Sequence, residues 1–259
     1  MFNKRIVVIA AIVLLVCALT SLVVLGVVYL TNSGYSIKGS GNLKNEDRQV
    51  SGFKNLIVNG QFTVTISPSE NETLTISAED NILPKIITEV KGDDLKIDFE
   101  RKFPYLSTIS VQNTKPIEIK LSYKTLNSIS LDGQGSIKNT AGNKIRTDTL
   151  NVSLAGSGTI GLDVFSTNIN STLTGSGIIE YSGSTSTQKI NLTGSGQYLA
   201  SNLESRETTI DLTGSGITKV RGDEKLTINL NGSGTVEYSG SPKKIDQNIT
   251  GSGIVKKTI

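Results

Sequence analysis

A short Gly-Ser-Gly motif recurs along the second half of the chain at nearly constant spacing. Six copies begin at glycines separated by 19, 19, 20, 18 and 19 residues. These glycines are Gly156, Gly175, Gly194, Gly214, Gly232 and Gly251. Gly133-Gln134-Gly135 is a variant copy upstream, and Gly39-Ser40-Gly41 is an isolated one. Self-similarity at a fixed period is typical of repeat architectures, in which each structural unit stacks on its neighbours.

The residues before each motif alternate between apolar and polar types. The position two residues before the first glycine is always aliphatic, and its members are Leu131, Leu154, Leu173, Leu192, Leu212, Leu230 and Ile249. The position four residues before is mostly aliphatic, and the one between them is always polar. This period of two predicts a strand with one buried face. The glycines that follow predict a sharp corner, because glycine adopts backbone angles that other residues avoid.

A repeat of this length favours an all-β fold in which each copy is one coil of a parallel β-helix. Each coil would add roughly 4.8 Å along the axis and stack like residues on like. An antiparallel meander with hairpins of the same length is the alternative, but its neighbouring strands run in opposite directions, so identical columns would stack less simply. We therefore predict a β-solenoid with an internal leucine column and Gly-Ser-Gly coils from about residue 131.

The first 30 residues have the pattern of a membrane segment. Lys4 and Arg5 precede a run from Ile6 to Leu30 that contains no charged residue. About 20 apolar residues span a bilayer as a helix, whereas the apolar part of a signal peptide is usually about 7–15 residues long. Because basic residues favour the cytoplasmic side, we predict one transmembrane helix at 6–30 with residues 1–5 in the cytoplasm. Residues 31–50 are then a linker to an external domain at 51–259.

Cleavage of this segment is the alternative, and it would release a secreted domain. Thr31-Asn32-Ser33 is an acceptable small-x-small cleavage site, and Ala18-Leu19-Thr20 is a weaker one. Cys17 resembles a lipoprotein site only faintly, since the residue before it is the bulky Val16. Each of these readings places the domain outside the cytoplasm.

The composition excludes several kinds of chemistry. The chain contains no histidine, which removes imidazole catalysis, Ser-His-Asp triads and histidine-ligated metals. Its single cysteine, Cys17, can form neither an intramolecular disulfide nor a thiolate cluster. A net charge of +3 spread over 259 residues argues against a nucleic-acid surface. We therefore expect no cofactor and no catalytic residue.

Two motif-like features are attributed to the repeat. The segment Gly156–Gly161 (GSGTIG) matches a dinucleotide fingerprint, but that fingerprint needs a helix after the turn, and strand-forming residues follow here. The acidic residues near the corners do not share one column, as the ligands of calcium-binding β-rolls do. They are Asp132, Asp163, Glu180, Asp211 and Glu237. We expect no bound nucleotide and no regular metal ladder, although a single calcium site of carboxylates and carbonyls stays open.

Glu180 and Glu237 raise the question of an enzyme, because polysaccharide lyases and hydrolases also use β-helices. The two residues share a column but lie three coils apart, about 14 Å at the usual strand spacing. Carboxylate pairs of glycosidases are roughly 5–9.5 Å apart. We interpret the column as a solvated face and keep a carbohydrate-active enzyme as the alternative function. Tyr181 and Tyr238, one position further, are interpreted as packing residues.

The predicted binding feature is the segment between Phe99 and Leu106, which interrupts the alternation and contains Pro104, a residue that excludes a central strand. Loops on a rigid scaffold commonly carry function, and cationic and aromatic side chains together suit a protein or an anionic glycan. The candidate partner-binding residues are Arg101, Lys102, Phe103 and Tyr105. The alternative is a loop that folds its aromatic residues over the open end of the helix, which needs a cap.

The first half of the domain adds a second pattern. Its segments, in order, are 53–60 (FKNLIVNG), 62–66 (FTVTI), 74–76 (LTI), 81–86 (NILPKI), 95–97 (LKI), 116–121 (PIEIKL) and 126–131 (LNSISL). This order, followed by the Gly-Ser-Gly coils, resembles the head GIN domain family, labelled auto-transporter adhesin, from about Ser51 to the C-terminus. Gln134 in the first corner departs from the pattern. The resemblance implies a right-handed parallel β-helix on a prokaryotic surface and supplies no catalytic residues.

Together these patterns predict a non-enzymatic, extracytoplasmic β-solenoid that acts as an adhesin-like binding or structural module. Its expected partners are the membrane, through the N-terminal span, and a surface protein or glycan, with no nucleic acid or nucleotide. Open strand edges can pair with other strands, so self-association into a homo-oligomer is a further expectation. Envelope sensing is a third hypothesis, supported by the topology alone.

Overall fold

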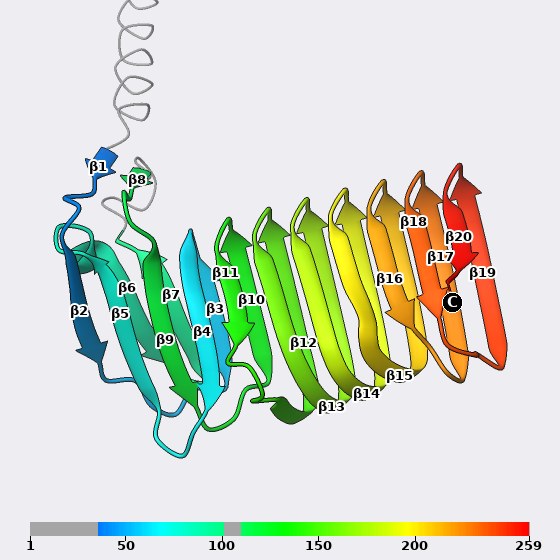
Figure 1. Cartoon of the computed structure of the whole chain (residues 1–259), viewed down its shortest axis with the longest axis horizontal. Helices are drawn as coiled ribbons and strands as arrows, with labels where there is room; N and C mark the ends of the chain where they lie inside the picture. Colours follow the sequence, from blue (N-terminus) through cyan, green and yellow to red (C-terminus); the bar gives the residue numbers. More distant parts are fainter. Residues whose placement is uncertain (1–35, 101–109, 259) are drawn as a thin grey trace, which may run out of the picture. The chain divides into compact units, whose positions relative to one another are not determined.

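The structure is a computed structural model that describes residues 36–100 and 110–258, which fall into two units. In the smaller unit, β1 (Ser36–Lys38) pairs in parallel with β8 (Ser110–Gln112). The larger unit runs from Gly39 to Phe99 and from Asn113 onward, and its strands form a β-solenoid of about seven turns (Figure 1). The predicted transmembrane helix at 6–30 lies outside the described residues. No helix within the described ranges is long and apolar enough to cross a membrane.

The sheet of the larger unit contains 18 strands. Those that precede the repeat are β2 (Leu43–Arg48), β3 (Asn55–Asn59), β4 (Phe62–Pro68), β5 (Thr73–Glu79), β6 (Ile86–Lys91), β7 (Asp94–Phe99) and β9 (Ile117–Tyr123), with the short 3-10 helix η1 (Leu83–Lys85) between β5 and β6. Those of the repeat are β10 (Ser128–Gly133), β11 (Ser136–Asn139), β12 (Ile145–Gly156), β13 (Thr159–Gly175), β14 (Ile178–Gly194), β15 (Gln197–Gly214), β16 (Ile217–Arg221), β17 (Lys225–Gly232), β18 (Thr235–Ser239), β19 (Lys244–Gly251) and β20 (Ile254–Lys257).

The predicted aliphatic column is continuous through the repeat. Parallel pairing places its members directly above one another, in the order Leu131, Leu154, Leu173, Leu192, Leu212, Leu230 and Ile249. All of them are buried except Ile249, which lies in the last coil. The parallel solenoid predicted for this part of the chain is confirmed, and the antiparallel meander is wrong there.

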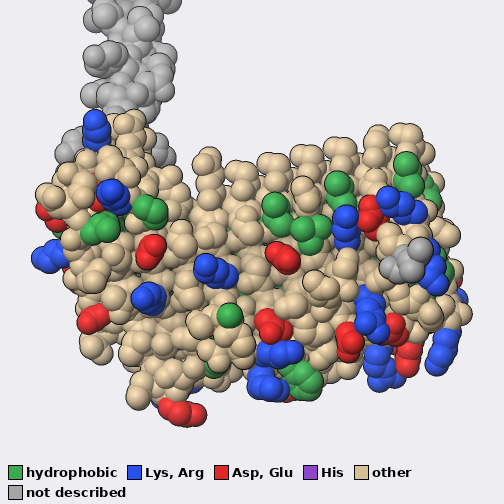
Figure 2. Space-filling model, in the orientation of Figure 1, with side chains coloured by type: hydrophobic (Ala, Val, Ile, Leu, Met, Phe, Trp, Pro, Cys, Tyr) green, Lys and Arg blue, Asp and Glu red, His purple; other side chains and the backbone are tan. Residues whose placement is uncertain are grey.

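The glycines form the predicted corners between the strands of each coil. The φ angle of Gly194 is +119°, and a Cβ atom at this position would lie 2.5 Å from the carbonyl oxygen of Gly175 in the coil before. Glycine is therefore required both for its backbone angle and for the close approach of the coils. Figure 2 shows this row of corners as a ridge without charged or apolar side chains.

The 20-residue interval of the repeat also has a structural explanation. Between β14 and β15 the pairing shifts: Glu180 lies opposite Leu199, but Ser182 lies opposite Asn202. This β-bulge accommodates the additional residue of the longer coil. The pairing returns to a common register before Gly194 and Gly214, so the corner column stays aligned.

The N-terminal end of the solenoid differs from the predicted parallel helix. The coil formed by β3 and β4 lies between two coils that follow it in the chain, β7–β9 on one side and β10–β11 on the other. Beyond them, β5 is antiparallel to β9, β2 to β5, and β6 to β7. The expectation of parallel coils throughout 51–259 is wrong at this end, because a period of two indicates the buried face of a strand but not its neighbour's direction. Residues 43–48, expected in a linker, form β2.

A buried carboxylate connects the segments at this end. Glu79 accepts hydrogen bonds from the backbone N–H groups of Gly41 (2.6 Å) and Thr114 (2.9 Å) and from the Thr114 hydroxyl (2.6 Å). The hydrogen bond from the Thr114 side chain, together with the backbone donors, lowers the pKa of Glu79 despite its desolvation. The ionised carboxylate thus holds the turn before β2 against the segment that leads into β9.

This carboxylate predicts an acid-dependent loss of stability. Because the pKa of Glu79 is lower in the folded chain than its ordinary value of 4.5, its stabilising effect is present above that value and lost as pH falls through the folded pKa. We expect Glu79→Gln to lower the melting temperature at neutral pH, with a difference from the wild type that shrinks in acid.

Circular dichroism melting between about pH 7 and pH 3 measures this difference. Glu118→Gln, at an exposed carboxylate on β9, is the matched control and is expected to have little effect at any pH. If the melting temperature of Glu79→Gln stays below that of the wild type by the same amount down to the lowest pH, the role of the ionised carboxylate is contradicted.

Candidate functional site

The predicted binding loop lies almost entirely outside the described residues. Arg101, Lys102, Phe103 and Tyr105 belong to this part of the chain, so their role stays a prediction. The Phe99 ring stacks on the ring of Phe62, with centroids 4.7 Å apart. Phe99 therefore contributes to packing against β4.

The structure does not bring the two predicted carboxylates together. Leu199 and Lys219 occupy the positions between Glu180 and Glu237 in the column. Glu237 instead accepts from two lysines, with its carboxylate oxygens 3.2 Å from the Lys219 Nζ and 3.0 Å from the Lys256 Nζ. The hydrogen bonds from Lys256 and Lys219 lower the pKa of Glu237. A carboxylate held ionised in this way is poorly suited to donate a proton to a leaving group.

Tyr181 lies in the interior, as the packing interpretation predicts. Its ring centroid is 5.6 Å from that of Tyr198 in the next coil, and its hydroxyl is 3.0 Å from the Ser171 hydroxyl. Burial raises the pKa of Tyr181 well above its ordinary range. Tyr238, near the C-terminal end of the stack, is partly exposed.

The charged side chains of the surface do not form a patch of one sign. Figure 2 shows basic and acidic groups interspersed over the visible face of the solenoid. Among residues 36–100 and 110–258, no group of three or more acidic, cysteine or histidine side chains is arranged to hold a metal ion.

A groove of about 960 Å³ runs along the second corner of four consecutive coils. This corner connects the two faces of the solenoid at the end of each coil away from the Gly-Ser-Gly turns. We call the depression the corner groove. It is lined by Thr125, Asn127, Arg146, Thr147, Asp148, Thr149, Asn151, Phe165, Ser166, Thr167, Ser184, Thr185 and Ser186. Its walls are therefore rich in hydroxyl groups and contain one large aromatic ring.

Inward-pointing hydroxyl groups shape the second corner. The Thr185 hydroxyl donates to the carbonyl oxygen of Thr187 (3.0 Å), and the Ser205 hydroxyl donates to that of Glu207 (2.9 Å) in the next coil. In each case the hydroxyl group of one residue bonds to the carbonyl oxygen two residues later, which stabilises the turn. The second corner is therefore formed by a side-chain hydrogen bond, whereas glycine forms the first corner. The residue just before the hydroxyl points outward and has no requirement to be small.

Phe165 occupies this outward position, between Arg146 and Ser184 of the neighbouring coils. Its side chain is 53% exposed, although it is large and apolar. The Cζ atom of Arg146 lies 5.2 Å from the centroid of the ring, a cation–π contact. Within the described residues, neither the Arg146 guanidinium nor the Asp148 carboxylate is shown with a hydrogen bond or an ion pair. The corner groove thus contains the Phe165 ring, the Arg146 guanidinium and the Asp148 carboxylate, and the two charged groups are available to a ligand.

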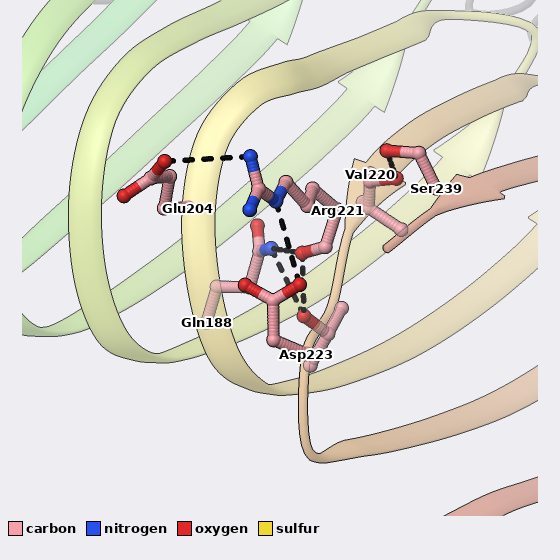
Figure 3. A network of polar contacts seen from close by, with 7 residues as sticks. Gln188, Glu204, Val220, Arg221, Asp223 and Ser239 are labelled. Atoms are coloured by element: carbon pink, nitrogen blue, oxygen red, sulfur yellow. Dashed lines mark hydrogen bonds and ion pairs between the residues drawn. The ribbon is translucent and has the colours of Figure 1, made fainter. Parts of the chain in front are cut away.

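The next coils along the same corner have a different arrangement. Figure 3 shows Arg221 between two carboxylates, with its Nη1 donating to Glu204 (3.3 Å) and its Nε donating to Asp223 (3.4 Å). The carbonyl oxygen of Arg221 accepts from the buried Gln188 Nε2 (3.3 Å). Both carboxylates are thus paired with Arg221 and support the fold, which distinguishes these charges from the unpaired charges of the corner groove.

Sequence reasoning did not find the corner groove. The copies were aligned only near the Gly-Ser-Gly turns, so the residues of the second corner were not compared between coils. The available signal was the column of Arg146, Phe165, Ser184 and Glu204, in which one aromatic residue stands among polar ones. An exposed aromatic residue on a rigid, hydroxyl-rich surface is a feature of binding sites.

The fold and the corner groove define a rigid β-solenoid scaffold that displays an open polar surface. The family described as "Putative auto-transporter adhesin, head GIN domain" matches residues 52–242. The chain therefore belongs to the head GIN domain family, and the resemblance seen in the sequence is confirmed. No curated protein matches the chain.

Solved structures share the fold at low sequence identity. A "putative adhesin" from Bacteroides fragilis matches with a TM-score of 0.77 and 23% identity, over 86% of this chain and all of its own. A "putative lipid binding protein" from Parabacteroides distasonis matches with a TM-score of 0.73 and 24% identity, over the same shares of the two chains. A "putative adhesin" from Parabacteroides merdae has a TM-score of 0.63 at 17% identity, over 87% of this chain and all of its own. At these identities the likeness supports the fold alone.

Proposed function

We propose that the chain is an extracytoplasmic binding module that recognises a carbohydrate in the corner groove. The observation that carries the proposal is the exposed Phe165 ring beside the unpaired Arg146 and Asp148. The membership of an adhesin-like family supports a role at the cell surface.

The chemistry of the corner groove suits a sugar ring. The C–H groups of a pyranose face pack on an aromatic ring, while its hydroxyl groups need both donors and acceptors. Arg146 supplies donors, Asp148 supplies acceptors, and the hydroxyl groups of Thr167 and Ser186 supply both. Because these groups lie on a β-scaffold with fixed register, little ordering of the site is required on binding.

We propose binding without cleavage. The described acidic pair that shares a column, Glu180 and Glu237, is separated by two intervening strands. Glu237 is also held ionised by Lys219 and Lys256. These features support a binding role over the alternative of a polysaccharide-cleaving enzyme.

The proposal includes attachment to the envelope. Residues 6–30 would cross the membrane once, with residues 1–5 in the cytoplasm and the solenoid outside, and cleavage of this segment would instead release the domain. The segment with Arg101, Lys102, Phe103 and Tyr105 would then offer a second contact surface of basic and aromatic character.

A glycan array probed with the purified full chain in detergent tests the carbohydrate proposal. We expect a defined subset of glycans to bind, and Phe165→Ala to weaken the tightest of these by about tenfold or more, since exposed aromatic residues dominate such contacts. Titration calorimetry with that glycan measures the change.

Ile87→Ala is the matched control, because Ile87 is an apolar residue of β6 with 40% exposure outside the corner groove. It should leave the affinity unchanged. The proposal fails if the wild type binds no glycan, or if Phe165→Ala and Ile87→Ala bind equally well.

A further inference from the structure

The two ends of the solenoid are finished differently. Among the described residues at the C-terminal end, β19 pairs with β17 alone, and β20 pairs with β18 alone. Every residue of β19 is exposed, including Ile249 (42%), which continues the leucine column of the interior, and Ile245 (37%), which pairs with the buried Leu226. Within residues 36–100 and 110–258, the coil formed by β19 and β20 therefore has an unpaired strand edge and apolar side chains that no other coil covers.

The direction of the free backbone groups follows from one hydrogen bond. The Lys244 N–H donates to the carbonyl oxygen of Glu224 (3.1 Å), which precedes its parallel partner Lys225. Backbone groups alternate in direction along a strand, so the next residue directs its N–H and C=O away from β17. Ile245, Gln247 and Ile249 thus direct their backbone groups toward the open end.

Ile245, Gln247 and Ile249 can pair with the same three residues in a second copy of β19 that runs antiparallel to the first. In an antiparallel pair, residues that exchange two hydrogen bonds lie directly opposite each other. In one register, two copies of β19 pair the free backbone groups of all three residues, with Gln247 opposite Gln247 and Ile245 opposite Ile249. The same register places Asp246 opposite Asn248 and Lys244 opposite Thr250, so no like charges are directly opposed.

The charges of the edge strands also favour this arrangement. In β19 the Lys244 Nζ lies 2.9 Å from the Asp246 carboxylate, and no charged residue follows as far as Gly251. At the other end, the edge strand β2 has the sequence LKNEDR, in which charged residues dominate. Charged edges oppose strand pairing, so the C-terminal end is the better partner for its own copy.

We propose that the last coil is a homophilic docking surface, through which two copies join by antiparallel pairing of β19 with β19. The two-fold axis passes between the Gln247 residues of the two copies. The interface is therefore isologous, and both copies use the same surface in a closed dimer. Pairing satisfies the backbone groups of the edge and covers Ile245 and Ile249 with the same residues of the partner.

Cysteine cross-linking of the full chain in its native membranes tests the proposed register. In a background with Cys17→Ser, Gln247→Cys places two sulfur atoms across the axis, where the Cα atoms of such a pair are about 5.5 Å apart. That separation lies within the range of a disulfide, so we expect a covalent dimer on oxidation.

Asn248→Cys is the matched control from the adjacent position. In the proposed register Asn248 faces Asp246, so two Asn248 residues are diagonal neighbours about 7–8 Å apart, beyond the range of a disulfide. This variant should give little dimer. Ile249→Lys added to Gln247→Cys should lower the dimer fraction about tenfold, because the lysine would face Ile245.

The outcomes separate the proposal from its alternatives. A dimer specific to Gln247→Cys and lost with Ile249→Lys supports the pairing. Equal dimer from the two cysteine variants indicates random collision, the absence of dimer removes the contact, and cross-links to a protein of another mass show a different occupant. Each of the last three results overturns the proposal.

Discussion

Gly194→Ala is expected to lower the stability of the solenoid by about 3 kcal/mol, the upper part of the range for a backbone forced into a sparsely populated region. Gly194 has a φ angle of +119°, which L side chains rarely adopt. The added methyl group would also lie 2.5 Å from the carbonyl oxygen of Gly175. Because the corners of neighbouring coils are in contact, neither coil can move without disturbing the next.

Gly161→Ala is the control for this change. A Cβ atom at Gly161 would meet no other atom within 4 Å, and its backbone angle is ordinary. Alanine there should be neutral or slightly stabilising, since it reduces the freedom of the unfolded chain. Thermal unfolding followed by circular dichroism compares the two variants, and equal melting temperatures would contradict the role assigned to the corner.

Leu192→Ala is expected to cost about 2–5 kcal/mol, as for other buried leucines replaced by alanine. Leu192 is fully buried and lies between Leu173 and Leu212 in the interior column. Truncation leaves a cavity against both neighbours, because the fixed spacing of the coils prevents the gap from closing.

Thr193→Ala, at the next and outward-pointing residue, is the control and should have little effect. Hydrogen exchange adds a test of the repeat architecture. Each coil contacts mainly its neighbours, so faster exchange should be concentrated around residues 173, 192 and 212. A loss of protection that is uniform along the whole stack would contradict this nearest-neighbour picture.

The repeat could be predicted from the sequence because local and global signals agree there. The leucine column gives the buried face, the glycines give the corner, and their common spacing gives the register between coils. Tyr181 illustrates the strength of this reasoning, since its column alone predicted its burial. The right-handedness implied by the family resemblance stays a prediction.

The N-terminal end could not be predicted in the same way. The β3–β4 coil pairs with β7–β9 and β10–β11, and no sequence spacing marks these distant partners. The antiparallel pairs β2–β5, β5–β9 and β6–β7 are not marked either, because a period of two indicates a buried face but not the direction of the neighbouring strand. No local pattern marks Glu79, whose buried carboxylate accepts hydrogen bonds from Gly41 and Thr114, both far from it along the chain.

The corner groove was missed for a related reason. Phe165 and Arg146 are 19 residues apart, and their contact exists only because β12 and β13 stack in register. A strand pattern distinguishes buried from exposed positions, but it does not show which exposed side chains meet across coils. The candidate residues Arg101, Lys102, Phe103 and Tyr105 lie outside the described residues and stay a prediction.

The stacking of Gly156 on Gly175 and of Gly175 on Gly194 has a consequence for the evolution of such genes. Successive coils present nearly the same upper and lower surfaces, so an in-frame duplication or deletion of one repeat joins surfaces that already fit. Chain length can therefore change by whole coils without a new kind of contact between neighbouring coils. Lineages of this fold should differ in the number of repeats more readily than in the length of any one of them, apart from bulges such as the one at Ser182.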